Sequence, residues 1–190
     1  DITTFEGDDA QVTVLFNGAQ PLVENHVSAK LEATLDPNYG NLRRVDLVHD
    51  SGVRHDITQE MESGTIGGII ELRDETLPTL LEQLDNFAFD LATNFNAAHT
   101  TGFGLDGVSG RDFFETPPGG AGAAASLSLI ADLDNNTDWI AASTSVVEAI
   151  GGNDNLAVLL DLEDQALAGS NTRTFREEIA NAMSSVGRLV

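Results

Sequence analysis

Residues 67–114 determine the fold of this chain, and they read GGIIELRDETLPTLLEQLDNFAFDLATNFNAAHTTGFGLDGVSGRDFF. It opens on two glycines and a short apolar run, and it closes on a loop rich in glycine and aspartate followed by Phe113 and Phe114. In between, apolar side chains recur every three or four residues, which predicts an amphipathic helix. The apolar positions are Leu77, Leu80, Leu84, Phe87, Leu91 and Ala98, widened by Leu81, Ala88 and Phe95, with Asn94 as the one polar member.

Pro78 interrupts this helical pattern near its start. Proline has no N–H to donate to Asp74, and it disfavours helical geometry at the residue before it. We therefore expect a short helix to about Asp74 and then a break or kink. The long helix should run from a capping Thr76 to about His99.

Upstream, roughly the first 60 residues predict β structure, because apolar and polar residues alternate. Asn17-Gly18 lies between two such runs and is a strong signal for a hairpin, since a type I′ turn needs positive φ at both central positions. Pro21 should then lie where no ladder donor is required. Strands are expected at 12–16, 19–23, 27–35, about 45–47 and 53–57.

Downstream, alternation of Leu127 and Leu129 with serines predicts a strand over 125–133. A helix should follow residues 151–155 and carry Leu156 to Leu167, with Gly169 just past its end. The last helix begins at Thr174, where Thr174-x-x-Glu177 matches a capping box.

Composition excludes several classes of function. The formal net charge of −22 argues against nucleic-acid binding and against docking on anionic membranes. No apolar run reaches the length of a membrane span, and the absence of cysteine excludes disulfides and thiol chemistry. Thirty-one acidic residues beside a single lysine, Lys30, fit either adaptation to high salt or an acidic surface that keeps the protein soluble.

Four patterns could carry chemistry, and each has a simpler structural interpretation. The His49-Asp50 and His55-Asp56 pairs flank a tight turn and lack further metal ligands. Asp132-x-Asp134-x-Asn136-x-Asp138 resembles a calcium loop but has Thr137 and Ser143 where glycine and glutamate are required. Gly102-x-Gly104-x-x-Gly107 follows a helix instead of a strand, and Ser126 and Ser128 lack nucleophile-elbow glycines. We therefore predict no catalytic, cofactor-binding or metal-binding residue, and no enzyme.

Four segments together resemble one protein family. The Gly-Gly start, Arg73-Asp74, the N-x-x-H of Asn96 and His99, and the closing Phe113-Phe114 match the central signature of the flagellar hook-associated protein 1 family. Residues 11–25 resemble its V-x-V-x-x-x-G-x-x-L-V segment, and residues 138–143 its D-P-x-x-I-A-A-S element, with Trp139 in place of the usual proline. Residues 151–160 are similar to its G-D-N-x-N-A-L-A-L helix.

The resemblance implies an α+β fold of elongated, flagellin-like axial type, with a β-rich hairpin module packed beside long helices. The expected modules are 1–65 and 66–190, the second mainly helical with one or two short strands. The chain is expected to be a central fragment, because it has no counterpart of the family's amino-terminal helices and only the start of the carboxy-terminal helix. Because it opens on Asp1, without a start methionine or a basic segment, residue 1 is not expected to be the natural start.

The resemblance also implies a function and a set of partners. It points to a non-catalytic structural subunit at the hook–filament junction, extracellular in the bacterial flagellum after export by the flagellar type III apparatus. Its partners would be further copies, the hook protein, the second junction protein and, through the missing carboxy-terminal region, an export chaperone. An acidic cell-surface adhesion or carbohydrate-binding module is the alternative, and a signal peptide or a sortase-type tail in the flanking sequence would favour it.

Overall fold

The structure is a computed structural model that describes residues 2–7 and 11–187. It divides into two compact units, Asp1–Thr76 and Leu77–Val190, which are described separately here. The first contains two antiparallel sheets and the second is mainly helical, which confirms the α+β class. The division falls later than the expected 65/66 boundary, because the short helix that follows residue 63 belongs to the β-rich unit.

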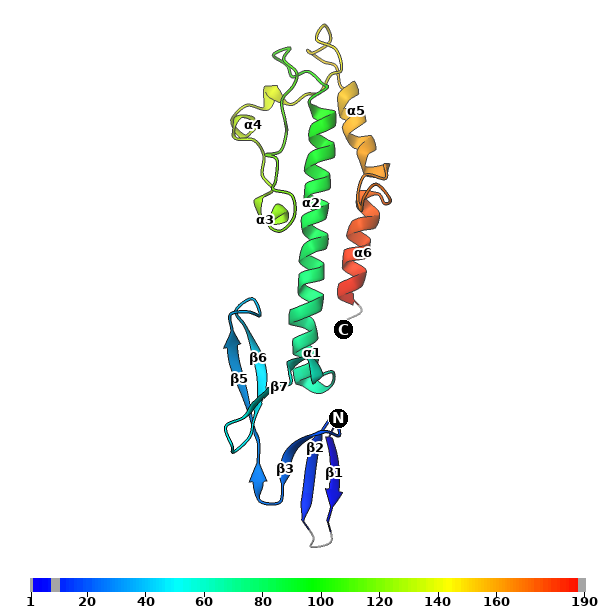
Figure 1. Ribbon diagram of the computed structural model, residues 1–190. Coiled ribbons are helices and arrows are strands. Elements are labelled where there is room, and N and C mark those ends of the chain that lie inside the picture. Colours follow the sequence, from blue (N-terminus) through cyan, green and yellow to red (C-terminus); the bar gives the residue numbers. More distant parts are fainter. Residues whose placement is uncertain (1, 8–10, 188–190) are drawn as a thin grey trace. The chain divides into compact units, whose positions relative to one another are not determined.

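The first sheet has the strand order β1-β2-β3-β4 and is wholly antiparallel (Figure 1). It consists of β1 (Ile2–Glu6), β2 (Val12–Phe16), β3 (Gln20–Glu24) and β4 (Val27–Ser28). Asn17 and Gly18 have φ of 49° and 69°, so the predicted hairpin turn is confirmed. β1 was not predicted. Pro21 lies opposite Leu15 on the part of β3 that β4 does not reach.

The second sheet has the order β5-β6-β7 and consists of β5 (Lys30–Asp36), β6 (Leu42–Val48) and β7 (Arg54–Asp56). The single strand predicted over 27–35 is wrong in one respect. The chain leaves the first sheet after Ser28 and enters the second at Lys30. Alternation continues across this point, so the pattern alone cannot show that the hydrogen-bonding partner changes from β3 to β6.

The core of this unit joins its two sheets. Phe16 from the first sheet, Leu47 from the second and Ile57 are buried together, with Leu22, Ala29, Val45 and Met61 packed around them. The short 3-10 helix η1 (Thr58–Glu60) follows directly, and α1 (Gly64–Glu71) comes next. Gly67 in α1 lies so close to the backbone of Met61 and Glu62 that a Cβ atom there would overlap it.

The predicted break before the long helix is replaced by a π-helical turn, η2 (Leu72–Thr76). No non-helical residue separates α1, η2 and α2 (Leu77–His99), and Thr76 lies inside the π turn instead of capping a helix. The physical reason is the same proline. A wider turn accommodates the missing donor and the ring of Pro78 without ending the helical pattern.

In the second unit, α2 packs against three later segments, α5 (Asp154–Asp161), the 3-10 helix η4 (Leu162–Asp164) and α6 (Phe175–Gly187) (Figure 1). The buried residues of this contact are Leu162, Ala168 and Phe175, and the seam of α2 supplies Phe87, Leu91, Phe95 and Ala98. The rings of Phe87 and Phe175 meet edge to face at 5.7 Å. The apolar stripe of α2 therefore packs on the last helix.

The helix predicted to reach Leu167 ends at Asp161, and this expectation is wrong. Asp161, Glu163 and Asp164 place negative charge where the helix dipole already has its negative end, which disfavours further turns. Gly169 instead has φ of 57° in a turn whose strand-like ends are Ala168 and Arg173. The capping box of α6 is confirmed, since Thr174 Oγ1 accepts from Glu177 N and Glu177 accepts from Thr174 N.

The strand predicted over 125–133 is also wrong. This segment forms two short helices, α3 (Ala123–Ser126) and α4 (Ala131–Asn135), followed by the 3-10 helix η3 (Thr137–Trp139). Only a single bridge, between Phe114 and Leu129, has β character there. The described part of this unit offers no neighbouring strand with which the alternating residues could form a sheet.

Candidate functional site

The first candidate region is a polar cluster at the carboxyl end of α2, built around Asn96. The Asn96 side chain is buried, and its Oδ1 accepts hydrogen bonds from the N–H groups of Phe113 and Phe114, both at 2.9 Å. Its Nδ2 donates to the carbonyl of Phe114 at 2.9 Å. One amide thus satisfies three backbone groups of a segment that would otherwise have no ladder partner there.

His99 performs a similar role one turn later. Its ring is fully buried; Nδ1 lies 2.8 Å from the carbonyl of Arg111, and Nε2 accepts from the N–H of Ala141 at 2.9 Å. Because Nε2 is an acceptor, Nδ1 carries the proton and donates it to Arg111. Burial lowers the pKa of the His99 imidazole, so the neutral ring is the form that fits.

Aromatic rings surround these two side chains. Phe95, Phe113 and Phe114 pack with centroid separations between 4.8 and 5.4 Å, and the ring of Phe113 meets that of His99 at 5.3 Å. We call Phe95, Asn96, His99, Phe113 and Phe114 the anchor cluster. It holds the loop after α2 against the helix and offers no free nucleophile, acid or base for chemistry.

The loop segments around the anchor cluster are fixed by close backbone approaches. Asn155 Nδ2 donates to the carbonyl of Ala141 at 2.7 Å, and a Cβ atom at Gly102 would overlap the Asn155 side chain. A Cβ atom at Gly104 would overlap the carbonyl of Asp138. These glycines are therefore required by packing, which supports the structural interpretation of Gly102-x-Gly104-x-x-Gly107.

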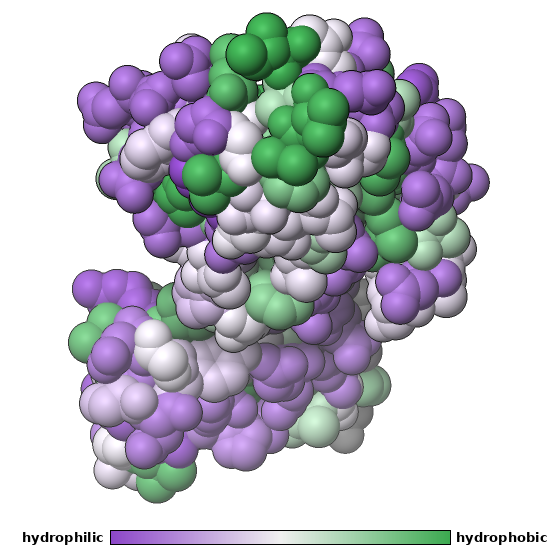
Figure 2. All heavy atoms as spheres, turned by 90° about the horizontal axis from the view of Figure 1, so that it is seen from above, coloured by the Kyte–Doolittle hydropathy of each residue, from purple (hydrophilic) through white to green (hydrophobic). Residues whose placement is uncertain are grey.

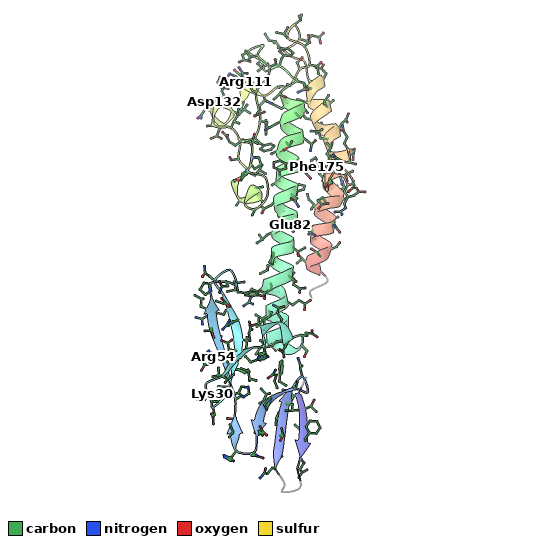
Figure 3. All side chains as sticks on the ribbon, in the orientation of Figure 1. Lys30, Arg54, Glu82, Arg111, Asp132 and Phe175 are labelled. Carbon is green, nitrogen blue, oxygen red and sulfur yellow. The ribbon has the colours of Figure 1, made fainter. Side chains whose placement is uncertain are left out.

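Arg111 holds the outer part of the same loop. Its guanidinium pairs with the carboxylate of Asp106 at 2.5 and 3.0 Å and stacks over the Trp139 ring at 4.5 Å. The hydrogen bonds from Arg111 lower the pKa of the Asp106 carboxyl, so this pair stays charged at neutral pH. Figure 3 labels Arg111 on this loop.

In the β-rich unit, a comparable latch ties the 37–41 turn to η2. Tyr39 donates its hydroxyl proton to Asp74 at 2.8 Å and accepts from Gln59 Nε2 at 2.8 Å. Arg73 pairs with Asp74 at 2.5 Å and also donates to the carbonyl of Arg43 at 2.6 Å. Arg73 and Asp74, which the sequence analysis placed in the family-like signature, therefore hold the 37–41 turn in place within this unit.

The second candidate region is an apolar groove between α2 and α6, with a volume of about 330 Å³. Met183 on its rim is 69% exposed, and Ile179 and Leu84 are also exposed. None of the 23 residues of α2 is lysine or arginine, and among the residues that line the groove only Glu178, on α6, is charged. The groove is lined by Leu80, Gln83, Leu84, Phe87, Glu178, Ile179, Ala182, Met183 and Val186.

The third candidate region is the apolar loop over 145–151. Val147 and Ile150 are 89% and 87% exposed, and Val146 is also exposed. Figure 2 looks at the molecule from above and shows hydrophobic residues gathered on that face. Apolar side chains left this accessible are typical of surfaces that another protein covers.

The histidine and acidic patterns considered as metal ligands do not converge. His55 lies 3.6 Å from Glu60, and the backbone of His49 closes the turn to Val53. Asp132 and Asp134 lie in α4, and Asn136 caps η3 by accepting from the N–H of Asp138. Across residues 2–7 and 11–187, no group of three or more histidine or acidic side chains could hold a metal ion.

The serines are also structural. Ser126 donates to the carbonyls of Gly122 and Ala123 within α3, and the carbonyl of Ser128 accepts from Glu115. No helix in the part of the chain that the structure describes is long and apolar enough to cross a bilayer.

Comparison with known families bears on what these surfaces are for. The model of the family described as "Flagellar hook-associated protein FlgK helical domain" matches residues 1–114, which is more than half of the chain. The chain belongs to this family. The match includes the β-rich unit, α2 and the whole anchor cluster, so the suspected resemblance is confirmed.

Two curated relatives agree with the family match. Flagellar hook-associated protein 1 of Salmonella typhimurium and that of Salmonella typhi are each 37% identical over 54 residues, which is 28% of this chain. The matched region spans 10% of either relative. The flagellar hook junction protein FlgK from Burkholderia pseudomallei aligns with 60% of this chain and 22% of its own at 20% identity, with a TM-score of 0.44.

The sequence singled out Asn96 and His99 as part of a motif but did not show what they bind. Their partners, the backbones of Phe113, Phe114, Arg111 and Ala141, lie up to 42 residues away. The exposed apolar loop was missed entirely. Three apolar residues at positions 146, 147 and 150 in a segment bordered by Gly151-Gly152 could have signalled it.

Proposed function

We propose that this chain is part of a structural, non-catalytic subunit of the bacterial flagellum at the hook–filament junction. Family membership over residues 1–114 is the observation that carries the proposal. The side chains that the motif emphasises support it, because Asn96, His99, Arg73 and Asp74 all hold backbone or side-chain partners in place. Residues of this kind build a stiff body instead of turning over a substrate.

The exposed apolar surfaces support a role in assembly. The groove between α2 and α6 is suited to an amphipathic helix, because it is lined almost entirely by apolar side chains and is bordered by two helices. We propose that terminal helices of the complete protein occupy it. The loop over 145–151 would then contact neighbouring subunits, which are copies of this protein, the hook protein or the second junction protein.

The proposed setting is extracellular. Export would use the flagellar type III apparatus, with a chaperone bound to the carboxy-terminal region. The net charge of −22 suits an exposed subunit that must stay soluble before it assembles. No observation on the described residues favours the adhesion or carbohydrate-binding alternative.

Deletion of the gene tests this function directly. We expect hooks without attached filaments under the electron microscope, and restoration by the wild-type gene. Normal filaments in the deletion strain would reject the proposal.

A matched pair of variants then tests the apolar loop. In the complete protein, Val147→Asp/Ile150→Asp should preserve the melting temperature but reduce filament attachment, because both side chains are exposed. Ser109→Asp, on the exposed part of another loop, adds a negative charge as a control and should support normal filaments.

A further inference from the structure

The β5 strand has a free edge whose backbone groups can be assigned. Among the described strands β5 pairs only with β6 (Figure 1). Val45, opposite Ala33, directs its backbone toward the β7 side, since its N–H donates to Thr58 Oγ1 at 2.8 Å and its carbonyl accepts from Ile57 at 2.9 Å. In an antiparallel pair of this kind the partner directs its own groups the opposite way, so Ala33 presents its N–H and C=O at the free edge.

The same alternation places the backbone groups of Leu31 and Leu35 at this edge. Their side chains lie with that of Ala33 on one face of the sheet, and they are 51% and 56% exposed. The edge therefore combines unpaired backbone groups with exposed apolar side chains, which is the combination that attracts another strand.

The β5 sequence, Lys30-Leu-Glu-Ala-Thr-Leu-Asp36, is complementary to itself when reversed. In an antiparallel pairing centred on Ala33, Leu31 of one copy lies opposite Leu35 of the other, and Glu32 lies opposite Thr34. Lys30 lies opposite Asp36 at both ends. Apolar meets apolar in the Leu31–Leu35 rows and at Ala33, and cation meets anion in the Lys30–Asp36 rows, so these side chains favour this register.

Lys30 supplies the charge complementarity in this pairing. It is the only lysine in the chain, it is exposed, and no ion pair of its ammonium is found within the described residues. Figure 3 labels its position. Asp36 is held by Arg44 at 3.0 Å and is still partly accessible. Because the chain has a net charge of −22 and only one lysine, the position of that lysine at the end of β5 distinguishes this edge.

In the single chain, Arg43 occupies the hydrogen-bond acceptor at the centre of the edge. Its side chain lies opposite Leu35, and Nη1 donates to the carbonyl of Ala33 at 2.9 Å. That carbonyl is the acceptor that an incoming strand would need first. Charged side chains placed over an edge are a known means of limiting strand addition.

We propose that β5 is a self-complementary pairing edge for a second copy of this chain, and that Arg43 restrains the pairing. A two-fold contact is complete with two copies and does not propagate into a larger assembly. The dimer is therefore proposed for the isolated chain, outside the junction, and does not depend on the proposed function. The contact is small and each copy is strongly acidic, so the dimer is weak and is favoured by salt.

Sedimentation equilibrium of the 190-residue chain in 1 M NaCl tests the restraint. Arg43→Ala should lower the dimer dissociation constant at least about tenfold relative to wild type, because the hydrogen bond from Arg43 to Ala33 in each of the two copies no longer has to be broken. Arg176→Ala removes an exposed arginine elsewhere and should leave the constant unchanged. An Arg43→Ala variant that dimerises no more tightly than wild type would overturn the proposal.

Two further variants identify the surface in the Arg43→Ala background. Ala33→Pro removes the central donor, and Lys30→Glu places like charges opposite Asp36, so either should reverse the gain. Circular dichroism shows whether each remains folded. A folded Lys30→Glu variant that still dimerises as tightly would mean that another surface is used, and the register would be wrong.

Cross-linking gives the register independently, because the chain has no cysteine. Ala33→Cys should form a disulfide-linked dimer under mild oxidation, since directly paired Cα atoms lie about 5.5 Å apart, within disulfide range. Ser184→Cys, on α6, is the control and should remain monomeric under the same conditions. Equal cross-linking of both variants would count against the pairing.

Discussion

At the scale of single residues, two side chains of α2 decide where the loops after the helix lie. Asn96 and His99 together bind backbone groups at residues 111, 113, 114 and 141. Each partner is a peptide group without a place in a helix or sheet ladder. The Asn and His of the N-x-x-H motif are thus explained by the backbone hydrogen bonds they satisfy, and not by reactivity.

Asn96→Ala removes three hydrogen bonds and leaves two N–H groups without their acceptor. We expect the free energy of unfolding to fall by about 2–4 kcal/mol, measured by urea denaturation. Asn86→Ala, at an exposed site of the same helix, is the control and should change it by less than about 0.5 kcal/mol. Equal effects of the two substitutions would contradict the assigned role of Asn96.

His99 makes stability depend on pH. Its pKa is lowered in the folded state, so the unfolded chain binds the proton more readily. The stabilisation is therefore fully present above the unfolded pKa of about 6.5, and it is lost as pH falls toward the lower folded pKa.

Urea titrations from pH 8 to pH 5 should show this loss in the wild type, at no more than about 1.4 kcal/mol per pH unit. His99→Asn should have a flatter profile over the same range, whatever its overall stability. His26→Asn, at an exposed turn, is the matched control and should keep the wild-type slope. A His99→Asn profile parallel to that of the wild type would refute the assignment.

At the scale of elements, α1 shows how closely helix and backbone approach each other in the β-rich unit. Gly67→Ala should lower the free energy of unfolding by about 1–3 kcal/mol, because the new methyl group overlaps backbone atoms of Met61 and Glu62. Gly68→Ala meets no atom within 4 Å and should raise it by about 0.5–1 kcal/mol. Thermal or urea unfolding of the two variants checks the opposite signs, and a stabilised Gly67→Ala would show that the approach is looser.

The elements also show what sequence can predict here. Asn17-Gly18 predicted a hairpin because its conformational requirement is local, and the period of α2 predicted a helix because 23 residues repeat it. The failures depend on distant partners. Ala29 lies where one strand run changes sheets, and residues 125–133 have the alternation of a strand without a strand to pair with. The candidate surfaces likewise became visible only once exposure was known.

At the scale of the whole molecule, the main feature is the large excess of negative charge. Thirty-one acidic and nine basic residues leave a formal charge of −22, and opposite charges meet in local networks such as Asp46 with Arg44 and Arg54. Burial would raise the pKa of the Asp46 carboxyl, but the hydrogen bond from Thr34 and the charge of Arg44 lower it. The remaining carboxylates repel one another across the surface.

Salt should therefore stabilise the chain. We expect the melting temperature to rise by several degrees between about 0.1 M and 1 M NaCl, because the screening length falls from about 10 Å to about 3 Å. Potassium chloride should act equally, since screening does not depend on the cation. No gain in either salt would argue against both self-repulsion and adaptation to high salinity.

Lys30 also gives the chain a single natural handle. Apart from the amino terminus, an amine-reactive reagent finds only this site, and it lies at the end of β5. A fluorophore attached there would report on one strand edge without mutation of the protein. Conversely, the rate at which Lys30 is acylated measures how accessible that edge is in a purified sample of the 190-residue chain.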